Sequence, residues 1–205
     1  MKFLIIFLLL LLPLLAEVGK ITHIKGNVSI QRDGKSKVAK AGMQLKQKDI
    51  ISTKKSSLAK ILFADKSAVS VGSKSNFSIE EYFFDAKKDS TAKFKIKRGV
   101  LRVITGKIAK ISPTHFKLKT KTATIGIRGT IFSGRVGEES EEWFCEKGAI
   151  YVKSKGVSMN IAKGFKTKIT RGNAPTKPQK YKTSDLQKLT SEMTGWKSKQ
   201  CQTKN

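Results

Sequence analysis

The sequence predicts an all-β domain, a single rolled or solenoid-like unit with a β-sandwich or roll as the alternative, and a short C-terminal helix. Two observations predict it: apolar and polar residues alternate with a period of two in many short segments, and turn residues separate most of these segments. The clearest alternation runs over 93–97 (Lys-Phe-Lys-Ile-Lys) and 115–121 (His-Phe-Lys-Leu-Lys-Thr-Lys). Such alternation places every second side chain in a core and its neighbours in water, as in half-buried strands.

Further strand-like segments recur along the chain at the short spacing that sandwiches and rolls show. They fall at 19–24, 26–32, 57–63, 67–72, 100–104, 123–127, 130–136, 149–153, 157–161 and 165–169. Asp33-Gly34 predicts a hairpin turn, because both central positions of a type I′ turn need positive φ. No repeat of fixed length is evident, so the solenoid and the sandwich both stay open.

The first sixteen residues have the layout of a secretory signal peptide. Lys2 precedes an apolar run from Phe3 to Ala16, which would reach only about 21 Å as a helix against a hydrocarbon core of about 30 Å. We expect export to the periplasm or beyond, with cleavage after Ala16. Leu14 lies where signal peptidases prefer a small residue, so an uncleaved anchor, with the membrane association that it would bring, stays open.

The chain is strongly basic, with a formal net charge of +27. Such a charge attracts anionic partners. Most of it comes from lysine, with 36 Lys and only 6 Arg among the 42 basic residues. Arginine supplies the planar fork that nucleic-acid recognition favours, so this composition argues against nucleic acid and leaves the anionic polymers of the cell envelope.

Catalytic machinery is not visible in the sequence, and we expect no metal or other cofactor. The two histidines, His23 and His115, lie far apart in strand-like segments and lack metal-ligand spacing. We find no nucleophile elbow and no phosphate-binding glycine loop followed by a helix. An acidic run from Glu138 to Glu146 is interpreted as a solvated loop or a counterweight to lysines. We therefore expect a binding or sensing domain that is not an enzyme.

Two rows of lysines form a possible anion-binding patch. Each row shares one face of its strand, because its apolar neighbours point into the core. If the two strands pair, the like charges repel one another, and a bound polyanion would relieve that repulsion. A plain solvated surface is the alternative. The lysine patch consists of Lys93, Lys95, Lys97, Lys117, Lys119 and Lys121.

Composition changes after Ile169, where the prolines of 171–182 indicate a linker between a β domain at 19–170 and a C-terminal segment at 183–205. Apolar residues fall on one helical face over 184–194, which predicts an amphipathic helix that either docks on the β domain or contacts a partner or membrane.

The two cysteines, Cys145 and Cys201, would meet an oxidising compartment if the chain is exported. A disulfide between them would tie the C-terminus to the β domain. The sequence does not show whether their Cα atoms approach within bonding range, so a disulfide and two free thiols are both open.

The most specific stretch is 122–132, Thr-Ala-Thr-Ile-Gly-Ile-Arg-Gly-Thr-Ile-Phe. Two glycines bracket Arg128, which allows close backbone approach and a bulge or bend. We interpret Arg128 either as a buried structural arginine, paired with a carboxylate such as Asp65, or as a fork for an anionic ligand. The candidate binding or structural motif is Gly126, Arg128, Gly129, Thr130 and Phe132.

This motif resembles the hallmark of the FecR domain family, a Gly-Val-Arg-Gly-Thr core followed by an acidic residue and Phe. The family's other landmarks are matched in the same order, so the resemblance runs from about residue 19 to 170; they lie at 42–45, 49–53, 58–65 and 99–101. The resemblance implies an extracytoplasmic all-β module that detects or transmits a signal by protein contact.

Two positions depart from the family pattern: Ile131 stands where the acidic residue is usual, and Lys66 stands where a turn glycine is usual. The regulators that give the family its name also carry a sigma-factor-binding region and a membrane helix ahead of this module. Neither is recognised in this sequence, so sigma-factor control is not carried over. We expect a sensor or adaptor that binds an envelope protein or, alternatively, an electrostatic binder of anionic envelope polymers.

Overall fold

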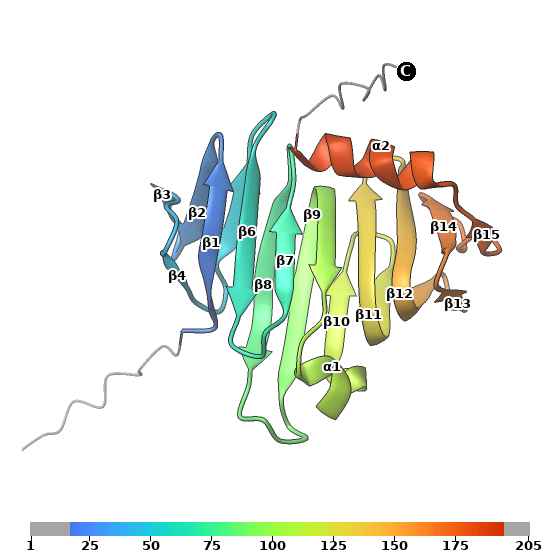
Figure 1. Ribbon diagram of the computed structural model, residues 1–205, viewed down its shortest axis with the longest axis horizontal. Helices are drawn as coiled ribbons and strands as arrows, with labels where there is room; N and C mark the ends of the chain where they lie inside the picture. The colour runs from blue at the N-terminus through green and yellow to red at the C-terminus, as the bar shows by residue number, and fades with distance from the viewer. Residues whose placement is uncertain (1–16, 195–205) are drawn as a thin grey trace, which may run out of the picture.

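The computed structural model describes residues 17–194. Its strands form one continuous fifteen-stranded sheet, which folds back on itself into two packed layers (Figure 1). The prediction of an all-β fold with a short C-terminal helix is confirmed. The proposed signal peptide and Cys201 lie outside the described residues, and the predicted domain boundaries stay predictions.

The front layer, on which the C-terminal helix lies in Figure 1, and the back layer share three long strands. The shared strands are β9 (Thr91–Ile104), β11 (Thr124–Val136) and β12 (Ser140–Ser154). The front layer adds β1 (Gly19–Lys25), β4 (Gln44–Leu45), β6 (Leu58–Phe63), β7 (Ala68–Val71), β14 (Phe165–Thr170) and β15 (Gln179–Lys180). The back layer adds β2 (Val28–Arg32), β3 (Lys35–Val38), β5 (Ile50–Thr53), β8 (Asn76–Phe83), β10 (Phe116–Lys119) and β13 (Val157–Ala162). The helical segments are α1 (Ile108–Ile111), η1 (Pro113–His115) and α2 (Thr183–Thr194).

Each shared strand changes its partners part-way along. The first half of β9, up to Arg98, pairs with β8 and β10, and the second half, from Gly99, pairs with β7 and β11. In the same way, β12 pairs with β14 over its first half and with β13 over its second half. These crossings join pairs of segments that the sequence predicted as separate strands, such as 93–97 with 100–104.

A glycine with positive φ lies at each crossing: Gly99 at +109°, Gly129 at +59° and Gly148 at +75°. At each of them the alternation of buried positions shifts by one residue. In β11, Ile125 and Ile127 face the core before the bend, whereas Phe132 faces it afterwards. A bulge of this kind lets a strand leave one layer for the other and still point its apolar residues inward.

The core lies between the layers and is centred on a group of aromatic rings. Phe94 of β9 lies 4.9 Å from Phe63, 5.4 Å from Phe77 and 5.6 Å from Phe116, measured between ring centroids. All four side chains are at most 2% exposed. Burial of each such side chain stabilises the fold by about 2–3 kcal/mol.

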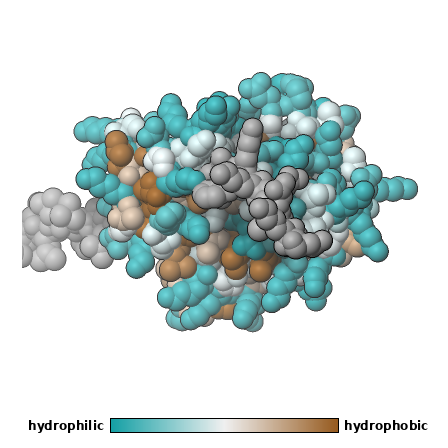
Figure 2. Space-filling model, turned by 45° about the horizontal axis from the view of Figure 1, so that its top comes forward, coloured by the Kyte–Doolittle hydropathy of each residue, from teal (hydrophilic) through white to brown (hydrophobic). Residues whose placement is uncertain are grey.

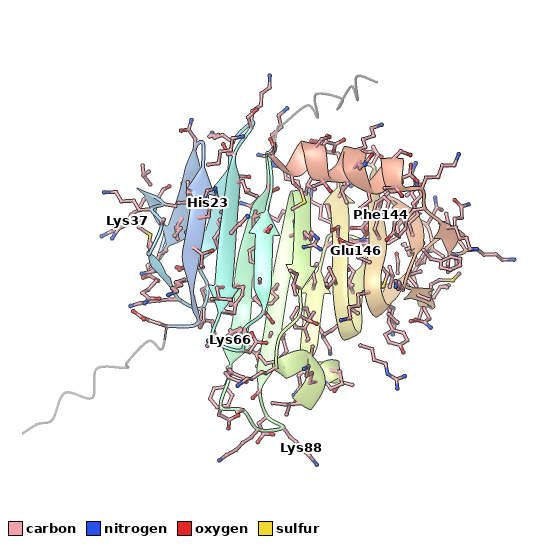
Figure 3. All side chains as sticks on the ribbon, viewed as in Figure 1. His23, Lys37, Lys66, Lys88, Phe144 and Glu146 are labelled. Carbon is pink, nitrogen blue, oxygen red and sulfur yellow. The ribbon has the colours of Figure 1, made fainter. Side chains whose placement is uncertain are left out.

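A buried carboxylate fixes the turn between β6 and β7. Asp65 is fully buried and accepts hydrogen bonds from the backbone N–H of Ser67 (3.0 Å), the Ser67 hydroxyl (2.7 Å), the Tyr82 hydroxyl (3.0 Å) and the backbone N–H of Ile108 (3.2 Å). Burial, and after it the charge of Asp65, raises the pKa of Tyr82. The next residue, Lys66, labelled in Figure 3, takes φ +69°, the conformation for which the family's turn glycine is suited.

Several elements follow the sequence prediction closely and others were missed. Asp33 and Gly34 have φ of +50° and +75° and connect β2 to β3, so the predicted hairpin is confirmed. Short or irregular strands such as β4, β5, β8 and β15 were not anticipated. The acidic run 138–146 was interpreted as a solvated loop, but most of it forms the first half of β12.

The helix α2 is docked on the outer face of the front layer. Leu189 and Met193 pack against Val100 and Phe144, and all four are at most 5% exposed. Lys166 adds an ion pair to Asp185 (3.2 Å). Among residues 17–194, no helix is long and apolar enough to cross a membrane. Figure 2 shows that hydrophilic residues cover most of the adjoining surface, with separate apolar patches between them.

Candidate functional site

The motif of 126–132 lies where β11 crosses between the layers. Its Gly129 meets Gly148 of β12, and we call this pair of glycines the glycine corner. A Cβ on Gly148 would lie 2.3 Å from the carbonyl oxygen of Gly129 and 2.9 Å from that of Arg128. Because no side chain fits at such distances, β11 and β12 bend together only if residue 148 is glycine.

The rest of the motif holds this corner in place. Thr130 and Phe132 are 3% and 0% exposed and face the core. The backbone of Thr130 is tied to the residue after β9: its N–H donates to the Thr105 hydroxyl (2.9 Å) and its carbonyl accepts from the Thr105 N–H (3.0 Å). These contacts give Gly129, Thr130 and Phe132 structural roles.

Arg128 is the exception in the motif, because its side chain is exposed. It has no ion-pair partner within residues 17–194, and Asp65 is bound by other groups. The interpretation of Arg128 as a buried arginine paired with Asp65 is therefore wrong. The physical reason is strand alternation: Ile125 and Ile127 face the core, which turns Arg128 outward.

A different arginine, missed by the sequence reasoning, forms the closest ion pair near the corner. Arg102 of β9 donates from Nη2 to Glu146 Oε2 (2.8 Å) and from Nε to Oε1 (3.0 Å), and the Ser133 hydroxyl donates to the same carboxylate (2.6 Å). Glu146, labelled in Figure 3, has a side chain only 15% exposed. Arg102, Ser133 and Glu146 lie on neighbouring strands, and only the pairing register of β9, β11 and β12 shows that their outward-pointing side chains meet.

The acidic run therefore acts in three different ways. Glu142 lies 3.8 Å from Arg135 and 3.7 Å from Lys166, which makes it a counterweight to basic residues, as the alternative interpretation proposed. Glu138 is exposed. Glu141 is 3% exposed and accepts hydrogen bonds from the hydroxyls of Thr120 and Thr122, while its Oε2 atom has no partner within the described chain. Burial raises the pKa of Glu141.

The two lysine rows come together on the outer face of the back layer. The strands that carry them, β9 and β10, pair in parallel, with Lys93 opposite Lys117 and Lys95 opposite Lys119. Like charges therefore stand side by side across the sheet, which destabilises it by about a few tenths of a kcal/mol per pair. Lys93 has a partner that relieves this, Glu81 at 2.7 Å.

Residues from a third strand extend the lysine patch, and the sequence reasoning missed them. Thr124 of β11 pairs with Lys119 on one side and with Lys153 of β12 on the other. Lys153 therefore lies in line with Lys119 across the sheet. Gly126 lies between Lys117 and Tyr151, whose side chain is 39% exposed. Period-two alternation within 149–153 was the available signal, but only the sheet order shows that β12 lies next to β11 and so one strand away from β10.

No cluster of three or more His, Cys, Asp or Glu side chains with metal-binding geometry is present in the described part of the chain. His23 and His115 are both exposed, on β1 and at the end of η1. Cys145 is buried, and burial raises the pKa of its thiol. A disulfide to Cys201 stays a prediction, because residue 201 lies outside the described range.

Comparison with family models gives one match, to the family described as FecR protein, over residues 49–151. This segment is half of the chain. The chain belongs to the FecR protein family. The matched segment runs from the end of the turn before β5 into the second half of β12, so it contains the glycine corner and the lysine patch. No curated protein sequence matches this FecR-family chain.

Solved structures with a similar fold include two crystal structures of a proposed anti-sigma factor from Parabacteroides distasonis, at 2.50 Å and 1.65 Å. Both align with a TM-score of 0.55, at 12% and 11% sequence identity. The alignments cover 67% of this chain and 62% of the crystallised chains, so the FecR-family chain spans less than two thirds of them. At this identity the likeness establishes the shared fold.

The exposed position of Arg128 predicts that Arg128→Ala changes the free energy of unfolding by less than about 0.5 kcal/mol. Arg102→Ala is the matched control and should cost about 1–2 kcal/mol, because it leaves the largely buried Glu146 without its guanidinium partner. Urea unfolding of both variants measures this. A loss for Arg128→Ala as large as that for Arg102→Ala would show that Arg128 is a structural residue after all.

Glu141 predicts a pH dependence of stability. Its pKa is raised in the folded protein above the value of 4.5 for an unperturbed glutamate, so the folded state holds the proton more tightly and loses stability as pH rises from about 4.5 through the folded pKa. Glu141→Gln removes this loss. The free energy of unfolding of Glu141→Gln minus that of the unmodified protein should therefore increase as pH rises from about 4 to about 8.

Glu139→Gln is the control, because the Glu139 side chain is 78% exposed. Its free energy of unfolding should follow that of the unmodified protein across the same range. A difference for Glu141→Gln that stays constant with pH would contradict the assignment of a raised pKa to this carboxyl group.

Proposed function

We propose that this chain is a non-enzymatic sensing or adaptor module of the cell envelope, which acts by contact with another protein. The observation that carries the proposal is the FecR family match over 49–151, which includes the crossings that shape the two layers. The fold shared with a proposed anti-sigma factor supports a signalling role. The carboxylates of Asp65 and Glu146 accept their hydrogen bonds from groups within the fold, which suits structural roles for both.

The proposed location outside the cytoplasm rests on the sequence of residues 1–16, an apolar run with a single lysine near its start. A chain exported in this way meets other envelope proteins and the anionic polymers of the envelope. Net charge of +27 would bring it quickly to either kind of partner, since opposite charge accelerates association.

A pull-down of tagged protein from envelope extract of the source bacterium tests the proposed function. We expect one protein partner to stay bound at about 0.5 M NaCl, because a specific protein interface has a desolvated core that salt does not screen. Mass spectrometry identifies the retained material. Retention of anionic polymer alone, lost at the higher salt concentration, would contradict the proposal and favour the alternative.

A second candidate function, electrostatic binding of anionic envelope polymers, is favoured by one observation, the parallel pairing of β9 with β10. This pairing sets the two rows side by side, with Lys93 opposite Lys117 and Lys95 opposite Lys119. A polyanion laid across these rows would relieve their mutual repulsion. Affinity for such a polymer should fall as salt rises, with a linear relation between the two logarithms.

Changing all six residues of the lysine patch to glutamine should weaken binding to heparin, used as a soluble polyanion, by at least about tenfold. The control removes the same charge from exposed lysines elsewhere and should weaken binding less than about threefold; it changes Lys20, Lys37, Lys40, Lys163, Lys168 and Lys177. Fluorescence anisotropy at low salt measures both. Equal losses would mean that total charge, and no particular face, attracts the polymer.

A further inference from the structure

A groove of about 820 Å³ lies at the end of the molecule where α2 ends. Five segments that are far apart in the sequence line it: the turn after β5, the turn before β8, the crossing of β9, the end of β11 with the turn that follows, and the last turn of α2. The tops of β6, β7 and β9 and the end of α2 meet at this place in Figure 1. The groove is therefore built by the two-layer fold as a whole.

Five basic and two acidic residues line the groove, so its rim is basic overall; of the two carboxylates, Glu192 pairs with Arg135 and Glu138 is exposed. Lys54, Lys55, Lys74 and Arg98 line the groove, are exposed, and have no ion-pair partner among residues 17–194. The fifth cation, Arg135, is already paired, with Nη2 2.7 Å from Oε1 of Glu192. A smaller adjoining pocket of about 300 Å³ is lined by three basic residues, Arg98, Lys97 and Lys121, and one acidic residue, Glu138, and its two lysines belong to the lysine patch.

The floor of the groove is apolar, and its two valines are each 5% exposed. Val100 and Val136 line it together with two glycines, Gly99 and Gly137. Gly99 cannot carry a side chain, because a Cβ there would lie 2.0 Å from the Ser75 hydroxyl oxygen. An apolar floor below a cationic rim suits a ligand that offers an apolar side chain between carboxylates. A phosphate or sugar polymer offers charge but nothing to fill such a floor.

Two occupants from this chain itself are disfavoured by charge. Residues 195–205, which continue from α2, include three lysines and no acidic residue. A second copy of the chain would bring another net charge of +27. Charge complementarity therefore points to a different, acidic molecule.

We propose that this groove binds an acidic peptide segment of the partner protein, with an apolar side chain seated on Val100 and Val136 and flanking carboxylates paired with Lys54, Lys74 and Arg98. This rests on the proposed function as a protein-contact module and assigns its docking site. Arg98 lines both the groove and the adjoining pocket.

The test uses the full chain and a fluorescein-labelled synthetic peptide, Asp-Glu-Leu-Asp-Glu-Val-Asp-Glu, with fluorescence anisotropy at about 0.1 M NaCl. A second peptide has serine in place of Leu and Val. The groove variant carries Lys54→Gln, Lys74→Gln and Arg98→Gln. A matched variant removes the same charge from the lysine patch through Lys95→Gln, Lys117→Gln and Lys119→Gln.

We expect the groove variant to raise the Kd of the first peptide at least about tenfold and the matched variant to raise it less than about threefold. The serine peptide should bind the unmodified chain about tenfold more weakly than the first peptide, a comparison that needs no protein variant. Equal weakening by both variants, equal binding of both peptides, or no binding of either would overturn the proposal. Since the three groove side chains are exposed and unpaired, the melting temperature of the groove variant should be unchanged.

Failure of this proposal can be told apart from failure of the proposed function. If the groove variant still captures the salt-resistant protein partner from envelope extract, the groove is not its docking site, while protein contact as the function stands. If the unmodified chain captures no protein but binds the first peptide with the expected dependence on the groove residues, the groove binds acidic peptides and the envelope-partner function is wrong.

Discussion

The structure depends on one constraint: three strands must pass from one layer to the other and keep their apolar residues in the core of both. Alternation along a straight strand cannot do this, so each strand inserts an extra residue where it bends, and a glycine with positive φ makes the bend. In β11 and β12 the bends lie so close that the carbonyl oxygen of Gly129 occupies the space of a side chain at Gly148. The family's most specific motif is, on this account, mainly a device for turning a strand.

The same bends decide what each outer face presents. Before its crossing, β9 turns lysines outward on the back layer; after it, Arg102 and Val100 point outward on the front layer, under or beside α2. One strand thus supplies half of the lysine patch on one face and both an ion pair and a helix-docking contact on the other. The groove forms at the end where the β9 crossing, the turns of β5 and β8 and the end of α2 converge. The contacts that stabilise the fold and the candidate binding surfaces therefore follow from the same sheet topology.

Much of this could be predicted from the sequence, because alternation of Phe94 and Ile96 with lysines reports directly which side chains are buried. The hairpin at Asp33-Gly34 was predictable since its turn chemistry is local. The orientation of Arg128 was wrongly predicted. Whether a motif residue points into the core or outward depends on which alternate positions of its strand face the core before and after a bend, and tertiary packing sets this. Arg102 and Glu146 lie 44 positions apart and meet only through β11, and the groove lining comes from five segments. Contacts of that range leave no local pattern.

The central claim, that close packing of two crossings requires a glycine, is tested most directly by urea unfolding of Gly148→Ala beside Gly156→Ala. Both glycines have almost the same φ, +75° and +76°, but a Cβ at residue 156 would meet nothing within 4 Å. Gly156→Ala should cost only the conformational penalty of about 1–2 kcal/mol. Gly148→Ala should cost at least about 2 kcal/mol more, because its methyl group displaces the backbone of Gly129. Equal losses for the two variants would contradict the account.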